Sequence, residues 1–397
     1  MYLFLMLFNK RSQFLYEFVY AAFFSNIFIT QVLDQYSGVA FPIRFLQMVM
    51  LCIYIFRYKM KINIIIYLII TYSVFLIIYY SDIYSISYIT NFITFYLIFV
   101  CGKDLVKDDF FEKKIIRLAS KILLTAIIYL AFTLTFGIGY AMYDENNTVG
   151  GLAMDRINIV AYCFVILIIY LIRNQISKKN IIYLFLGIIS ILIVSKRLPI
   201  LMIVVGFIIA LLQSKLNLKK IFLLLRVIVV FSVFILLLPQ KYGLGRLEMR
   251  GQKVQVQNGV IEKESRYLEY LFIFNYLEES KVENFLIGNN FKSTHNYRKK
   301  YLDLEDREIH TGYINNIYRF GIIGFSLIIS FFIWIAINIY KIPKNRNIRN
   351  LGFPLLFMLL LYEGVDIVHE GFPSVIVFMI FGRLVGEFKR PKNLKLT

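Results

Sequence analysis

Lys196 and Arg197 lie in the segment VSKRLP, which joins two short apolar runs and places two positive charges in one tight hairpin. Arg44 and Arg156 are two further cations beside apolar runs. A cation in such a place needs an anion, and the planar guanidinium of arginine binds phosphate or carboxylate through two parallel hydrogen bonds. Each of these residues either binds an anionic substrate or contacts the head groups of anionic lipids. For Arg197 we favour the substrate.

Arg266 and His310 are the next candidates. Arg266 lies in SRYLEYLFIF, whose apolar residues recur every three or four positions. This spacing predicts an amphipathic helix along a membrane surface, on which Arg266 either binds an anion or is solvated beside a neighbouring glutamate. His310 precedes an apolar run, so we expect it at the boundary between water and lipid. An imidazole there can take up or release a proton near neutral pH.

Three acidic residues and a histidine follow a later apolar run. Glu363, Asp366 and Glu370 share one helical face by their spacing, and His369 lies next to Glu370. The pattern predicts an acidic external cap, which is either a substrate rim or a cation site.

The composition excludes an ordinary soluble globular protein. Of the 397 residues 59% are hydrophobic, and apolar runs near 20 residues recur along the chain. The net charge of +19 does not indicate nucleic-acid binding, because the lysines and arginines form short clusters between the apolar runs, as topology signals do. The three cysteines lie singly in apolar runs and predict neither disulfides nor a zinc site. The first residues, MYLFLMLFNKR, do not resemble a cleavable signal peptide.

We predict an all-α, polytopic integral membrane protein with about twelve transmembrane helices. The expected spans are 14–33, 38–56, 62–80, 83–101, 117–138, 157–172, 181–195, 198–212, 221–238, 313–340, 351–365 and 373–388.

Clusters of lysine and arginine occur at every second connection, and such clusters mark cytoplasmic loops. Both termini are therefore expected in the cytoplasm, with the chain as a multi-pass protein of the plasma membrane. The clusters contain Lys10, Arg57, Lys113, Lys178, Lys219, Arg346 and Lys389.

One long connection, 239–310, is predicted to form a large extracytoplasmic loop between the ninth and tenth spans. Its charges are mixed in sign, and long loops cross the membrane regardless of charge. No internal repeat or second soluble domain is visible, so 1–397 is treated as a single transmembrane domain.

The tenth span contains Arg319, Gly321 and Gly324. The two glycines predict close packing between helices. On a straight helix Arg319 would lie about 13 Å deeper than His310, and its burial would require a partner or a wet cavity.

Four segments, in this order, resemble the superfamily of bacterial O-antigen polymerases and O-antigen ligases. They are GGLAMDRINIVAY, VSKRLPILM, SRYLEYLFIF followed by FLIGNNF, and HTGYINNIYRFGIIG. In the same order, they are similar to four motifs of that superfamily: the Asn-x-x-Ala segment, the Ser-x-Arg hairpin, the loop helix that contains an arginine and is followed by a glycine turn, and the helix that contains a histidine followed by Gly-x-x-Gly. The similarity by motif covers about residues 149–340.

The resemblance implies a metal-independent membrane glycosyltransferase with a helical, GT-C-like fold and without a cofactor. Its substrate would be an oligosaccharide repeat unit on a polyprenyl diphosphate, polymerised into O-antigen or capsule at the outer face. Arg197 and Arg266 would stabilise the leaving diphosphate, and His310 would bind or deprotonate the attacking sugar hydroxyl. The expected partners are the lipid-linked oligosaccharide, the bilayer, a chain-length regulator and a flippase. The further substrate-binding candidates are Lys196, Arg156, Arg44, Asn158 and Tyr313.

Two other functions remain open. A ligase would transfer the glycan to a lipid A core instead of to another repeat unit. A transporter of the same lipid-linked sugar would bind it near the bilayer midplane, often on broken helices, and Glu17, Arg226 and Arg319 would fit that function. A receptor or scaffold would explain the long loop but not Arg197.

Overall fold

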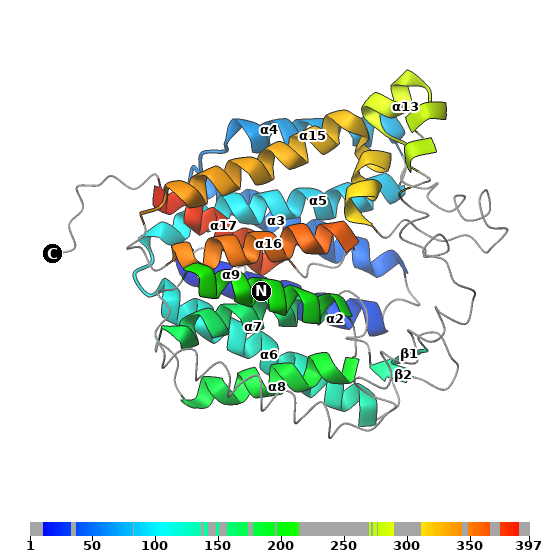
Figure 1. Ribbon diagram of the computed structural model, residues 1–397. Helices are drawn as coiled ribbons and strands as arrows, with labels where there is room; N and C mark the ends of the chain where they lie inside the picture. The colour runs from blue at the N-terminus through cyan, green and yellow to red at the C-terminus, as the bar shows by residue number, and fades with distance from the viewer. Residues whose placement is uncertain are drawn as a thin grey trace.

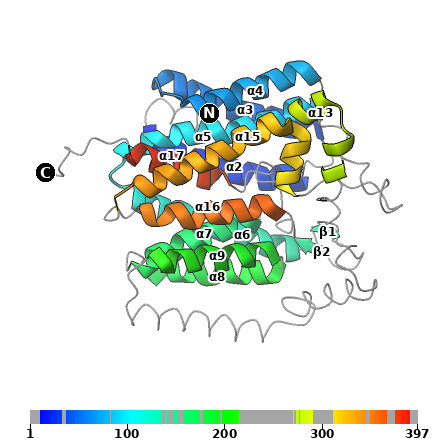
Figure 2. The same cartoon turned by 45° about the horizontal axis from the view of Figure 1, so that its top comes forward.

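The computed structural model describes the chain in several stretches. They are residues 11–32, 37–81, 83–135, 139–141, 148–150, 157–173, 178–194, 197–213, 270, 273–275, 277–289, 311–343, 348–365 and 374–388. Within them the fold is helical, with helices that lie largely side by side in a bundle (Figures 1 and 2). The helices are α2 (Arg11–Val32), α3 (Ser37–Arg57), α4 (Ile64–Tyr80), α5 (Ile83–Gly102), η1 (Lys103–Lys107), α6 (Phe111–Thr135), α7 (Ile157–Ile172), α8 (Lys178–Val194), α9 (Arg197–Gln213), α13 (Val282–Ile287), α15 (Gly312–Lys341), α16 (Arg349–Val365) and α17 (Val375–Phe388).

Two short strands, β1 (Gly139–Ala141) and β2 (Thr148–Gly150), form an antiparallel hairpin with Tyr140 opposite Val149. The sequence did not predict this hairpin. It lies at the same end of the bundle as α13, and we call this end the hairpin end (Figure 1).

Eleven of the twelve predicted spans coincide with helices of the structure, and the ninth, 221–238, lies outside the described residues. Within the described part, three helices are long and apolar enough to cross a membrane: Ser85–Lys107, Phe111–Phe132 and Gly312–Lys341. Shorter apolar helices include Ile64–Tyr80 and Leu198–Gln213. The helical fold is confirmed, whereas the count of twelve spans stays a prediction.

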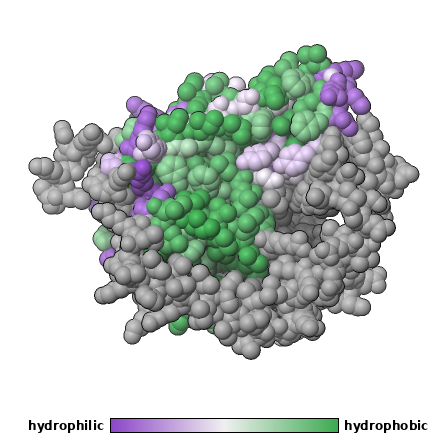
Figure 3. Space-filling view, in the orientation of Figure 1, coloured by the Kyte–Doolittle hydropathy of each residue, from purple (hydrophilic) through white to green (hydrophobic). Residues whose placement is uncertain are grey.

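An apolar surface lies between the two ends of the bundle. Figure 3 shows hydrophobic residues over the middle of the visible face and hydrophilic residues toward both ends. Large apolar side chains are exposed there instead of buried, among them Ile64, Leu68 and Ile78 of α4 and Ile333 and Ile337 of α15. A soluble protein rarely exposes so many neighbouring apolar groups, so this belt is typical of a surface that contacts lipid.

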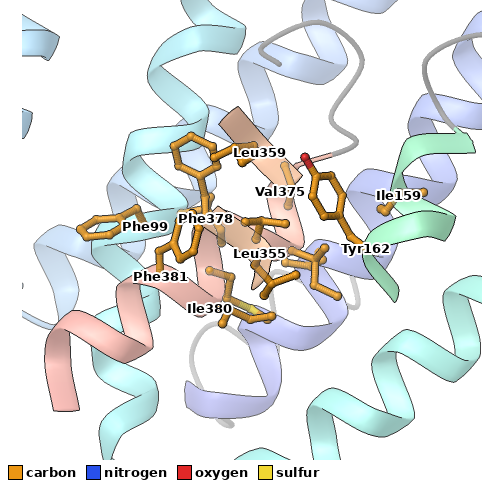
Figure 4. Close-up of a cluster of buried hydrophobic side chains, with 14 of the residues drawn as sticks. Phe99, Ile159, Tyr162, Leu355, Leu359, Val375, Phe378, Ile380 and Phe381 are labelled. Carbon is orange, nitrogen blue, oxygen red and sulfur yellow. The ribbon is translucent and has the colours of Figure 1, made fainter. Parts of the chain in front are cut away.

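α17 lies at the centre of the core. Its side chains are buried from Val375 to Val385, because α5, α15 and α16 pack around it. Figure 4 shows Phe378 and Phe381 of α17 beside Phe99 of α5 and Leu355 of α16. The approach to α5 is close, since a Cβ at Gly382 would overlap the carbonyl oxygen of Phe99. Small residues allow this contact between helix backbones.

Ionic contacts close the bundle at the end opposite the hairpin. Asp104 forms an ion pair with Arg11 and accepts a 2.8 Å hydrogen bond from the Tyr54 hydroxyl. Asp108 accepts hydrogen bonds from Tyr16 at 3.2 Å and from Lys114 at 2.8 Å. These contacts tie α2, α3 and α6 to the end of α5, on the side where the sequence predicts the cytoplasm.

α15 is bent at Gly321, where the backbone adopts φ 61° and ψ −175°. Residues 312–320 turn away from the axis of residues 322–341 and lie at the hairpin end (Figures 1 and 2). The longer part, about 30 Å by helical rise, has the length of the apolar layer. The prediction of one continuous helix over 313–340 was therefore wrong at Gly321, where the helix bends. The predicted close packing at the two glycines is confirmed, since a Cβ at Gly321 would overlap the Leu286 carbonyl oxygen and a Cβ at Gly324 would overlap the Tyr72 ring.

The backbone groups freed by the bend bind neighbouring elements. The amide of Asn289, just after α13, donates a 2.7 Å hydrogen bond to the carbonyl of Tyr318. The Tyr72 hydroxyl lies 2.7 Å from the Phe320 carbonyl oxygen and 3.0 Å from the Ile287 carbonyl oxygen, and it donates between them. Tyr80 donates to the Gly288 carbonyl at 2.6 Å. α4 and α13 thus hold the bend in place, as broken membrane helices require.

We expect Gly321→Ala to destabilise the protein by about 1–3 kcal/mol or more, because only glycine adopts this backbone conformation readily. A Cβ at this position would also overlap the Leu286 carbonyl oxygen. The measurement is the thermal unfolding midpoint of purified protein in detergent. Gly364→Ala is the control, since its Cβ would meet Cε2 of Tyr313 at an ordinary 3.6 Å. Equal midpoints for the two variants would contradict the role assigned to the bend.

Candidate functional site

Polar side chains gather inside the hairpin end of the bundle, where α7, α15, α16 and α17 meet. Each has 0–1% of its surface exposed. Burying polar side chains costs free energy unless they form hydrogen bonds with each other or with a ligand. We call the set the polar cluster, and its members are Asn158, Tyr162, Asn315, Asn316, Glu363 and Ser374.

Four helix ends position the cluster. Asn158 and Tyr162 are four residues apart on α7 and share one face of that helix. Ser374 directly precedes α17, and Glu363 lies in the last turn of α16. Asn315 and Asn316 belong to the part of α15 that precedes the bend, so the bend places them beside the end of α16.

Glu363 is the charged residue at the centre of the cluster. The Asn316 side-chain amide donates a hydrogen bond to its Oε1 atom, which links α15 to α16. The carboxylate also interacts electrostatically with the hydroxyls of Tyr96, Tyr162 and Tyr313. Tyr162 lies beside Leu359 and Val375, with its hydroxyl at the edge of the apolar core (Figure 4). Glu363 is thus a fully buried acid in an aromatic and amide environment.

Several amide atoms of the cluster have no hydrogen-bond partner among the described residues. They are Nδ2 and Oδ1 of Asn158, Nδ2 and Oδ1 of Asn315, and Oδ1 of Asn316. Few buried polar atoms in native proteins are left unpaired, and each such atom needs an explanation. Amides that can both donate and accept suit a ligand whose groups do the same.

Arg319 lies one helical turn after Asn315 and is only 4% exposed. Its guanidinium lies over the Tyr88 ring, 4.2 Å from the centroid, and that ring contacts Phe320. The expectation that a buried Arg319 needs a partner is confirmed by this cation–π contact. The depth of Arg319 relative to His310 stays a prediction, because His310 lies outside the described residues; the bend at Gly321 follows two residues after Arg319.

The structure brings two of the predicted site residues to this end of the bundle. Asn158 belongs to the polar cluster. Tyr313 is half-buried, and its hydroxyl donates a 2.9 Å hydrogen bond to the Leu360 carbonyl of α16. Arg44 lies in α3, which packs against α2 and α5, so the structure does not place it in the cluster.

Arg197 begins α9, only three positions after α8 ends at Val194, as expected for a tight hairpin. α9 packs against α7 and α16, two helices of the cluster, although the Arg197 side chain lies outside the described part of the structure. The other predicted residues, Lys196, Arg156, Arg266 and His310, lie outside the described residues.

The sequence prediction misplaced Glu363 and did not single out Asn315 and Asn316. Glu363 was expected in an acidic external cap, but it is buried against Asn316; Asp366, His369 and Glu370 lie outside the described residues. The available signal was the adjacent pair Asn315–Asn316 in a largely apolar helix, since buried amides are costly. No group of three metal-ligating side chains occurs among the described residues.

Comparisons with known proteins do not identify a family: no family model and no curated protein matches the chain.

We expect Asn316→Leu to destabilise the protein by about 1–3 kcal/mol, because the Glu363 carboxylate loses a buried donor. Thermal unfolding in detergent measures this effect. The double variant Asn316→Leu/Glu363→Leu should recover part of the lost stability, since it removes the buried carboxylate together with its donor. A double variant that is no more stable than Asn316→Leu would show that the contact does not satisfy Glu363.

Proposed function

We propose that the chain is a membrane glycosyltransferase that polymerises polyprenyl-diphosphate-linked oligosaccharide units into surface polysaccharide at the outer face of a bacterial plasma membrane. The observation that carries the proposal is the polar cluster, a buried group of amides and one carboxylate at one end of an apolar helical bundle. Such a site suits a hydroxyl-rich ligand that arrives on a lipid.

The chemistry of the cluster supports a sugar ligand. Sugar hydroxyls donate and accept hydrogen bonds, and so do the side-chain amides of Asn158 and Asn315, whose atoms are unpaired among the described residues. Binding sites commonly combine apolar walls with a few convergent polar groups. The apolar belt around the bundle suits a polyprenyl chain beside the same site.

The motifs support the leaving-group half of the reaction. The motifs fall on neighbouring helices: α7 contains Asn158, α9 begins with Arg197, and α15 contains the segment that follows His310. α9 packs against α7 and α16, and α15 packs against α16. In the proposal Arg197 and Arg266 neutralise the diphosphate as the glycosidic bond breaks, assisted by Lys196 and Arg156. His310 binds the incoming sugar. The same motif order in O-antigen polymerases and ligases supports these roles.

The size ladder of the surface glycan tests this function. In a strain that lacks the chain, we expect only single repeat units on the acceptor, and wild-type protein should restore the ladder. Arg197→Ala and His310→Ala should fail to restore it, because diphosphate stabilisation and acceptor binding are each lost. Arg349→Ala is a matched control at the opposite end of the bundle and should restore the ladder at equal membrane levels.

Two other outcomes would replace the proposal. Polymer that accumulates on the polyprenyl carrier without reaching a lipid A core would indicate a ligase. A full ladder from Arg197→Ala and His310→Ala proteins would contradict the assigned roles.

A transporter is the second candidate function, and the bend in α15 is the observation that favours it. Transporters bind substrate at broken helices, and residues 312–320 carry the buried Arg319 next to the break. A transporter predicts that single repeat units accumulate on the cytoplasmic leaflet when the chain is absent.

A further inference from the structure

We infer that Glu363 is the catalytic residue that accepts the proton of the attacking sugar hydroxyl, and that Asn158, Asn315 and Asn316 bind the sugar that carries this hydroxyl. The inference rests on the proposed function and adds a proton acceptor and an acceptor-sugar subsite to it.

The surroundings of Glu363 support this role. The residue is fully buried in the last turn of α16, and ionisable groups inside a membrane protein are costly and are commonly functional. The Asn316 amide binds Oε1 and fixes the orientation of the carboxylate. A general base must be held in this way, because proton transfer depends on distance and direction.

The sugar subsite follows from the unpaired amides. Asn315 is adjacent to Asn316 on α15, and Asn158 lies one turn from Tyr162, whose hydroxyl interacts with Glu363. The amide atoms of Asn158 and Asn315 together offer two donors and two acceptors that are unpaired among the described residues. In this inference, hydroxyls of a pyranose ring bond to the two amides and one further hydroxyl is the group that Glu363 deprotonates.

The chemical step balances without a metal or a redox partner. The acceptor hydroxyl oxygen attacks the anomeric carbon of the donor glycan, and a new C–O bond forms. The bond from that carbon to the diphosphate oxygen breaks, and its electron pair leaves with the polyprenyl diphosphate. The hydroxyl proton passes to the carboxylate of Glu363, which later releases it to water.

The bend in α15 positions this subsite. The contact of Gly288 with Gly321, together with the hydrogen bonds from Tyr72 and Asn289, fixes the bend against α4 and the residues that follow α13. Hydrogen bonds from Tyr313 and Asn316 join residues 312–320 to α16. Asn316 therefore reaches Glu363 from a segment whose direction differs from that of the rest of α15, and Asn315 is its neighbour on that segment.

Glu363→Gln separates a catalytic role from a structural one. Glutamine has nearly the same shape, and its oxygen can still accept the hydrogen bond from Asn316, but it cannot take up a proton at neutral pH. A structural role therefore predicts that activity is retained. A proton acceptor predicts a loss of about 10²–10⁴-fold in turnover.

The experiment uses purified full-length protein in detergent with a lipid-linked repeat unit as the substrate, and it follows the initial rate of chain extension and the rate as a function of pH. Glu387→Gln is the matched control, since Glu387 is a buried acid at the opposite end of the bundle, paired with Arg383. We expect the Glu387→Gln protein to extend chains at a rate within about threefold of the wild-type rate. The Glu363→Gln protein should lose this rate, and its remaining activity should no longer fall as the pH is lowered.

The outcomes distinguish this inference from the proposed function. If wild-type protein does not extend the substrate, the proposed function fails. If wild-type and Glu363→Gln proteins both extend it at similar rates, the inference fails and the proposed function stands. Should Glu363→Gln not purify as a folded protein, Glu363→Asp replaces it. The shorter carboxylate should then act at a reduced rate, and an unchanged rate would overturn the inference.

Discussion

The bend of α15 at Gly321 is the constraint on which the hairpin end of the bundle depends. A helix that breaks inside an apolar environment leaves backbone groups that must be bonded elsewhere. Tyr72 of α4 and the residues that follow α13 supply these bonds, to the carbonyls of Phe320 and Tyr318. A segment far from α4 in the sequence is thereby fixed to it, and the first part of α15 keeps one direction.

The direction of that segment has chemical consequences. It brings Asn316 to Glu363, leaves both amide atoms of Asn315 buried, and sets Arg319 against Tyr88. Around this polar interior the bundle is apolar, with an uninterrupted buried stretch in α17 and exposed apolar side chains on α4. The polar groups thus lie buried at one end of an apolar bundle, and the proposed function rests on this placement.

Much of the fold could be predicted from the sequence, because apolar runs of nearly constant length have one physical solution, the helix. α7, for example, coincides with its predicted span. The bend could not be predicted, since a glycine in an apolar run is equally compatible with a straight, closely packed helix. Only the hydrogen-bond partners of the freed carbonyls distinguish a bent helix from a straight one, and the sequence does not show them. Glu363 was misplaced for a related reason: its acidic neighbours suggested solvent, whereas the bent segment of α15 covers it. The short hairpin β1–β2 gave no periodic signal.

The central claim is that the chain forms glycosidic bonds, and it can be tested without a membrane. Purified wild-type protein in detergent would be mixed with one defined lipid-linked repeat unit, and the products analysed by mass spectrometry. We expect lipid-linked products of two and more repeat units, together with free polyprenyl diphosphate. If the repeat unit remained unchanged in detergent but moved between leaflets when the same protein was placed in vesicles, the chain would be a transporter and not a glycosyltransferase.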